Sequence, residues 1–85
     1  MSVPTVFRGG EIQAGGNVRV GELGSRGGAA TRVVVGPGAV VTVGHAFENA
    51  SVVVGGRVYR FKREEKGVRL WLDKEGNLRY KGVPA

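Results

Sequence analysis

The sequence predicts an all-β protein in which coils of short strands are followed by a three-stranded antiparallel meander. Glycine supplies 16 of the 85 residues, where an average protein has about 7%. Short valine-rich runs lie between the glycines, and valine fits pleated sheets well. No segment combines helical apolar spacing over three turns with a capped start. Valine-rich strands separated by glycine turns explain both the high glycine content and the valine-rich runs.

The first two thirds of the chain contain the short strands. Pro4 confines the first of them to a sheet edge or a strand start. Residues 18–23 alternate between apolar and polar or glycine positions, as a half-buried strand does, and residues 36–38 (GPG) end a later strand. The strands expected here span residues 3–8, 11–14, 18–23, 31–35, 40–43 and 51–54.

The short length and regular spacing of these strands favour a β-helix-like coil over residues 10–56. Strands recur roughly every 8–12 residues with glycine corners, a pattern typical of stacked rungs in a solenoid. In such a coil the inward side chains stack in ladders. The residues predicted to point inward are Val18, Val20, Val33, Val35, Val41, Val43, Val52 and Val54.

The last third, residues 57–81, predicts the meander and completes a single domain over residues 1–85. Its three strands span residues 57–63, 68–72 and 77–81, and the connections 64–67 and 73–76 each end in glycine, as hairpin loops often do. Alternation assigns one apolar face: Tyr59, Phe61, Val68, Leu70, Leu72, Leu78 and Tyr80. The meander is expected to continue or to cap the coil through four of these residues: Tyr59, Phe61, Leu70 and Leu72.

The other face of this segment is basic. Nine of the 13 Lys and Arg residues lie from residue 57 onward, against four of the seven acidic residues, although the whole chain has a net charge of +6. The predicted basic face consists of Arg60, Lys62, Arg69, Trp71, Arg79 and Lys81. Cations around an aromatic ring can bind single-stranded nucleic acid. A solvated outer surface, or a contact between copies through Trp71, explains the same pattern.

The composition predicts a protein that is not an enzyme and has no cofactor. Cysteine is absent and His45 is the only histidine, so thiolate and histidine-based metal sites have no basis. The glycine pairs lack the spacing of a phosphate-binding loop, and the adjacent carboxylates fall in predicted turns. We therefore expect no catalytic, cofactor-binding or metal-binding residues.

The partner expected first is another copy of the chain. A domain of this size without disulfides has a modest core and often gains stability by oligomerising. A protein partner is a further expectation, and nucleic acid is the alternative partner. No apolar run approaches the roughly 20 residues of a membrane helix, and no targeting segment is visible, so we expect a cytoplasmic protein without membrane insertion.

The order of the glycine and valine motifs resembles the C-terminal β-helix of the bacterial flagellar assembly protein A family (FapA-like). The resemblance extends from about residue 10 to about residue 83. The similar segments are residues 10–20 (GEIQAGGNVRV), 23–25 (LGS), 31–36 (TRVVVG), 41–44 (VTVG), 49–55 (NASVVVG) and 59–61 (YRF).

This resemblance implies a minimal, right-handed, single-stranded β-helix, related in architecture to bactofilins and to the C-terminal domain of the division inhibitor MinC. Those relatives act as polymer-forming or scaffold domains. Family members place a helical insertion between two β-helix segments, whereas residues 36–38 join them directly here. The expected function is a structural module that acts by self-association or by protein–protein interaction.

Overall fold

The computed structural model describes residues 6–7, 9–27 and 30–82, and in these ranges the chain forms strands and no helix. The predicted all-β class is confirmed. The strands are β1 (Val6–Phe7), β2 (Gly10–Ala14), β3 (Val18–Leu23), β4 (Thr31–Val35), β5 (Val41–Ala46), β6 (Ala50–Val54), β7 (Arg57–Arg60), β8 (Glu65–Leu72) and β9 (Leu78–Gly82). The rest of the strand predicted over residues 3–8 lies outside the described residues. No helix in these ranges has the length and apolarity needed to cross a membrane.

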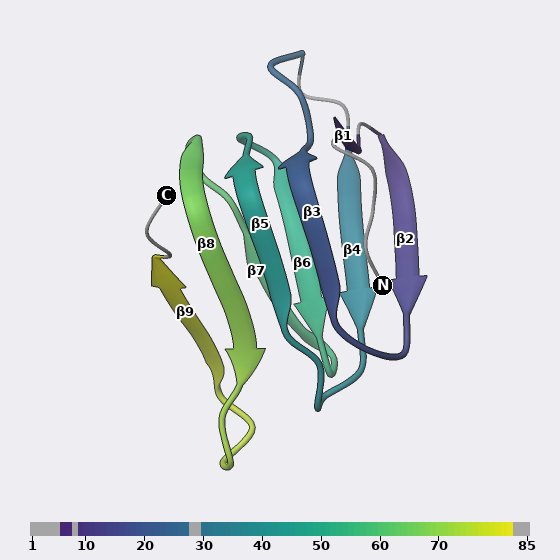
Figure 1. Ribbon diagram of the computed structural model, residues 1–85, viewed down its shortest axis with the longest axis vertical. Coiled ribbons are helices and arrows are strands. Elements are labelled where there is room, and N and C mark those ends of the chain that lie inside the picture. Colours follow the sequence, from purple (N-terminus) through teal and green to yellow (C-terminus); the bar gives the residue numbers. More distant parts are fainter. Residues whose placement is uncertain (1–5, 8, 28–29, 83–85) are drawn as a thin grey trace.

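The strands form two mixed sheets, with β2 and β9 at opposite ends of the assembly (Figure 1). The five-stranded sheet has the order β1-β3-β5-β8-β9, and the four-stranded sheet has the order β2-β4-β6-β7. Through β6 the chain changes sheet after every strand, and neighbours within each sheet are parallel. From β7 onward each new strand pairs antiparallel to its neighbour.

The core lies between the two sheets and is built mainly from valine. All eight valines predicted to point inward are at most 4% exposed, which confirms the alternation of the short strands. Phe61, Val68 and Leu70 are also buried, and Tyr59, Leu72 and Leu78 pack against this core from its margin. Tyr80, which the sequence assigns to the same apolar face, remains 40% exposed.

The predicted three-stranded meander over residues 57–81 is wrong in its first strand. β7 pairs with β6 in the four-stranded sheet, whereas β8 and β9 belong to the five-stranded sheet. The cause is a two-residue loop between the paired residues Val54 and Arg57. Gly55 and Gly56 have φ values of 54° and 84°, and positive φ at both positions is what a tight hairpin loop of this kind requires. β7 therefore folds back on β6.

The antiparallel pairing of the last two predicted strands is confirmed, but the connection before them differs. β8 begins at Glu65, so residues 65–67 belong to a strand rather than to a hairpin loop. Residues 61–64 instead cross from the four-stranded to the five-stranded sheet. Phe61 starts this crossing, and its ring fills the core beneath it.

The alternation of buried and exposed side chains is interrupted at Gly21 in β3 and at Gly44 in β5. These two glycines lie side by side, and we call the interruption the glycine step. Val18 and Val20 point inward and the next fully buried residue of β3 is Leu23, which is three positions on. β5 repeats this spacing after Val43. A Cβ atom on Gly44 would lie 2.7 Å from the carbonyl oxygen of Gly21, so close approach of the two backbones requires glycine there. Gly21 and Gly44 contribute no side chain to the outer surface of the sheet at this step.

Candidate functional site

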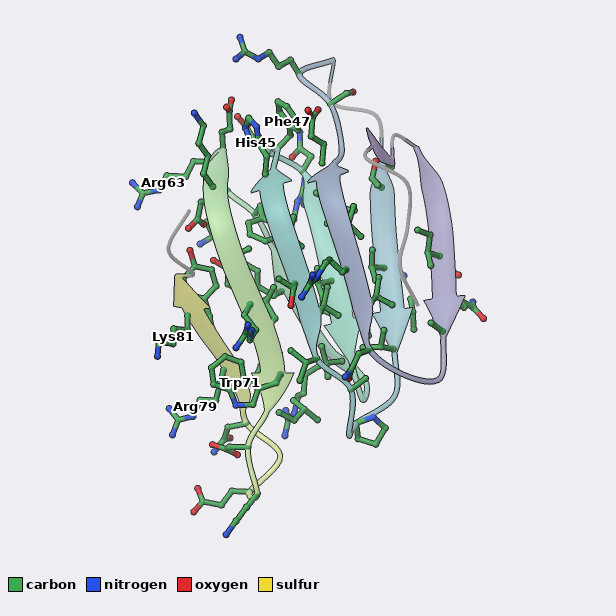
Figure 2. The ribbon with its side chains drawn as sticks, viewed as in Figure 1. His45, Phe47, Arg63, Trp71, Arg79 and Lys81 are labelled. Carbon is green, nitrogen blue, oxygen red and sulfur yellow. The ribbon has the colours of Figure 1, made fainter. Side chains whose placement is uncertain are left out.

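The structure brings together four of the six residues of the predicted basic face. Arg69 pairs with Lys81, and Trp71 pairs with Arg79, across strands β8 and β9 of the five-stranded sheet. These four side chains lie on its outer surface, and Figure 2 shows Trp71, Arg79 and Lys81 on the same hairpin.

The other two residues of the predicted basic face lie elsewhere. Arg60 is the last residue of β7 in the four-stranded sheet, and Lys62 follows it in the crossing segment. Their separation follows from the β6–β7 hairpin, which places β7 in the opposite sheet.

Arg19, which the sequence pattern did not assign to the basic face, lies on the outer surface of the same sheet as Arg69 and Lys81. The register of the five-stranded sheet aligns Arg19 with Thr42, Thr42 with Arg69, and Arg69 with Lys81. We call Arg19, Arg69 and Lys81 the cationic row, and the row together with Trp71 and Arg79 the cationic platform. The pattern V-x-V-G occurs at residues 18–21 and again at residues 41–44. Aligning these two copies predicts that Arg19 lies beside Thr42.

The three side chains of the cationic row are exposed and form no ion pair with any of the described residues. Adjacent strands lie about 4.8 Å apart, so the row extends over about 14 Å from β3 to β9. Arg79 differs, because its Nε donates a hydrogen bond to Asp73 Oδ2 at 2.9 Å. The unneutralised positive charge of the platform is therefore concentrated in the row.

Asp73 organises the turn between β8 and β9. Its Oδ1 accepts hydrogen bonds from the backbone N–H groups of Asn77 and Glu75, each at 2.9 Å. The bond from Asn77, with smaller contributions from Glu75 and the charge of Arg79, holds the pKa of the Asp73 carboxyl below its ordinary value of 3.8. The carboxylate thus stays charged and keeps Arg79 in place beside Trp71.

Because of Asp73, the stability of this hairpin is expected to fall in the acid pH range. Because its pKa is lower in the folded than in the unfolded chain, its stabilising effect is complete above the ordinary carboxyl value and is lost as the pH falls through the folded-state pKa. We expect the wild type to exceed Asp73→Asn in free energy of unfolding at neutral pH, and this difference to shrink below about pH 3.8. Urea denaturation of both proteins across this range measures it, and a difference that grows with acidification would contradict the assignment.

The outer surface of the four-stranded sheet has a different character. One row across it pairs Glu11 with Arg32, Arg32 with Ser51, and Ser51 with Arg60. Arg60 donates a hydrogen bond to Asn49 Oδ1 at 2.8 Å. The neighbouring row contains valines, including Val58, which is 60% exposed. Charges of both signs and apolar groups mix here, so this surface lacks the single-sign field of the cationic platform.

His45 belongs to a small polar cluster at one end of the five-stranded sheet, where Figure 2 labels it beside Phe47. Its Nε2 lies 2.5 Å from Glu64 Oε2, and its ring stacks on Phe47 with centroids 4.3 Å apart. Arg26 approaches the same Glu64 oxygen at 4.0 Å. No group of three metal-ligating side chains exists in the described ranges. The cluster ties the start of β8 to the end of β5.

Aromatic side chains close the C-terminal end of the strand stack. The Tyr59 and Tyr80 rings stack at 5.3 Å, and Phe61 meets Tyr59 edge-on at 4.9 Å. The hydroxyls of both tyrosines donate to the Glu65 carboxylate. Burial, and then the charge of Glu65, raise the pKa of the Tyr59 hydroxyl above 10.0. β9 therefore covers the end of the core near β7.

The opposite end of the stack is open at β2. This strand pairs with β4 on one side, and no strand of residues 6–7, 9–27 and 30–82 pairs with its other side. Ile12 lies in the same cross-strand row as the buried residues Val33 and Val52, but it is only half-buried. The incomplete burial of Ile12 marks where the core ends without a cover among the described residues.

No family model, no curated protein and no solved structure matches this chain.

Proposed function

We propose that the chain is a non-enzymatic structural module that associates with further copies of itself through the open edge of β2. The observation that carries the proposal is the side of β2 with which no described strand pairs, next to the half-buried Ile12. We further propose that the alternation of parallel strands between the two sheets is a short right-handed β-helix. The scaffold role implied by the resemblance to the flagellar assembly protein A family, and a cytoplasmic location, belong to the same proposal.

Comparison of the sheet edges supports β2 as the site of association. Native edge strands are protected by shortness, by charged side chains, lysine above all, or by a cover. β1 has two described residues, β7 presents Arg57 and Arg60, and β9 presents Arg79 and Lys81. β2 has five residues and no cation, and its one charged side chain is Glu11. Among the residues that the structure describes, β2 is the least protected of the four edges.

Antiparallel pairing of two β2 strands about Ile12 would be chemically complementary. Gln13 would lie opposite Glu11 of the second copy, so no like charges would face each other, and the two Ile12 side chains would become neighbours. The backbone N–H of Gly10 donates to Ala30. Because backbone groups alternate sides along a strand, those of Glu11 and Gln13 point to the free edge. Such a dimer would extend the four-stranded sheet across both copies.

Sedimentation equilibrium of the purified chain tests this proposal. We expect the weight-average mass to rise from monomer to dimer across concentrations of about 1 µM to 1 mM. Gln13→Pro should keep the protein monomeric, since it removes an edge N–H while leaving the ladder to β4 intact. Gln13→Ala is the matched control, because it retains the N–H, and it should associate like the wild type. A wild-type chain that stays monomeric throughout would sink the proposal.

A further inference from the structure

We propose that the cationic platform binds single-stranded nucleic acid, with the cationic row on the phosphates and Trp71 stacked on a base. This inference is separate from the association through β2, because the platform lies on β3, β8 and β9 and shares no residue with that edge. Either proposal can fail without the other.

The arrangement of charge favours a linear polyanion. Arg19, Arg69 and Lys81 follow one row across the sheet, at right angles to the strands, and form no ion pair with the described residues. Arginine and lysine that neutralise phosphates supply most of the affinity for a nucleic acid backbone. A row of three exposed cations over about 14 Å matches an extended strand better than a single compact anion.

The position of Trp71 favours nucleotides over other polyanions. Trp71 lies on the same face of β8 as Arg69, two residues along, and is directly opposite Arg79. Its side chain is partly exposed. Stacking on an aromatic side chain accepts any base, and an arginine beside the ring adds to it. The hydrogen bond from Arg79 Nε to Asp73 fixes the guanidinium next to this ring.

The glycine step gives a strand room to approach the sheet. Gly21, Gly44 and Gly67 lie on β3, β5 and β8 just beyond the cationic row. Thr42 is the only side chain between Arg19 and Arg69 in the row itself. These glycines carry no side chain and lie on the side of the row away from Trp71, so they leave room for the sugar–phosphate backbone while a base stacks on the ring.

The experiment follows the emission of Trp71 during titration with an oligothymidylate of about 12 nucleotides. Trp71 is the only tryptophan of the chain, so its emission reports on the platform alone. We expect quenching on binding. Three phosphate contacts to a single strand predict an affinity that falls about 20-fold between about 50 and about 200 mM salt. Self-association of a chain with a net charge of +6 should instead strengthen as salt screens the repulsion.

Two double variants with the same change in net charge distinguish binding at the cationic platform from general electrostatic attraction to the protein. The double variant Arg19→Gln/Arg69→Gln should lose about tenfold or more in affinity and most of the salt dependence. Arg32→Gln/Arg60→Gln removes the same charge from the outer surface of the four-stranded sheet, and it should bind within about twofold of the wild type. Equal losses in the two double variants would overturn the proposal.

Substitution of the aromatic ring tests the stacking. Both variants lack the tryptophan reporter, so their affinities are measured by the fluorescence anisotropy of a dye-labelled oligothymidylate, beside the wild type. Trp71→Ala should weaken binding by about 5- to 150-fold, while Trp71→Phe should restore most of the affinity. Circular dichroism of each variant confirms that it is folded before binding is measured.

Two competing ligands complete the test. Polyphosphate, which has no bases, should leave Trp71 emission nearly unchanged, and phosphatidylserine vesicles or an acidic peptide should not compete with the oligonucleotide at equal charge. Emission that is indifferent to the oligonucleotide at low salt, or that responds more strongly to any of these other anions, would overturn the proposal.

Discussion

Replacing Phe61 with alanine is expected to lower the free energy of unfolding by about 3–5 kcal/mol. Phe61 is fully buried and has the largest of the fully buried side chains in the described part of the chain. Its backbone N–H donates to Ala50, and its carbonyl accepts from Asn49, so the backbone is held in place and cannot collapse into the cavity. A domain of this size has a total stability of about 4–13 kcal/mol. The loss is therefore a large part of the whole.

The matched comparison for Phe61 uses an apolar residue of the preceding strand, β7. Val58→Ala removes a side chain that is 60% exposed, and it should change stability by no more than about 0.5 kcal/mol. Urea denaturation of the two variants beside the wild type gives both values. If Phe61→Ala cost no more than Val58→Ala, the assignment of Phe61 to the core would be wrong.

Replacing Gly55 with alanine is expected to cost about 2–5 kcal/mol, from two causes that act together. Gly55 has a φ of 54°, which costs a residue with a Cβ atom about 1–2 kcal/mol. The new Cβ would also lie 2.8 Å from Pro37 Cβ and 2.9 Å from Pro37 Cα. The rigid proline ring cannot rotate away, so the backbone must shift, which typically costs another 1–3 kcal/mol.

Gly56 is the matched control for this variant, because it shares the strain without the crowding. Its φ is 84°, and a Cβ atom there would have nothing within 4 Å. Gly56→Ala should therefore show the cost of the backbone conformation alone, about 1–2 kcal/mol. Equal losses at the two positions, measured by urea denaturation, would show that Pro37 does not crowd residue 55 and that the β6–β7 loop is packed differently.

Local alternation was enough to predict the core, and it failed where two local patterns compete. Val33, Val35, Val52 and Val54 alternate with polar or less buried residues, and the side-chain period of two holds wherever one face of a strand is buried. The glycine pair after Val54 fits both a corner between sheets and a tight hairpin loop. Only contacts with Pro37 and the rest of the fold select the hairpin, so the sheet membership of β7 could not be predicted from its own sequence.

The candidate site was predicted in part for the same reason. Arg69, Trp71, Arg79 and Lys81 belong to one hairpin, whose pairing follows from the short loop over residues 73–77 between its strands. Arg19 is 50 positions from Arg69 in the chain, and only the register of β3, β5 and β8 brings the two into one row. The repeated V-x-V-G pattern indicates the alignment of β3 with β5. The pairing of β5 with β8 had no local signal.

Amide hydrogen exchange of Glu11 and Gln13, followed by NMR as the protein concentration is raised, tests the central claim most directly. The claim is that the open edge of β2 joins copies of the chain. It predicts that both amides exchange quickly in dilute solution and become protected as dimers form, while the amides of β7 keep their exchange rates. Protection of Glu11 and Gln13 that does not change with concentration would contradict the claim, whatever the mass of the protein in solution.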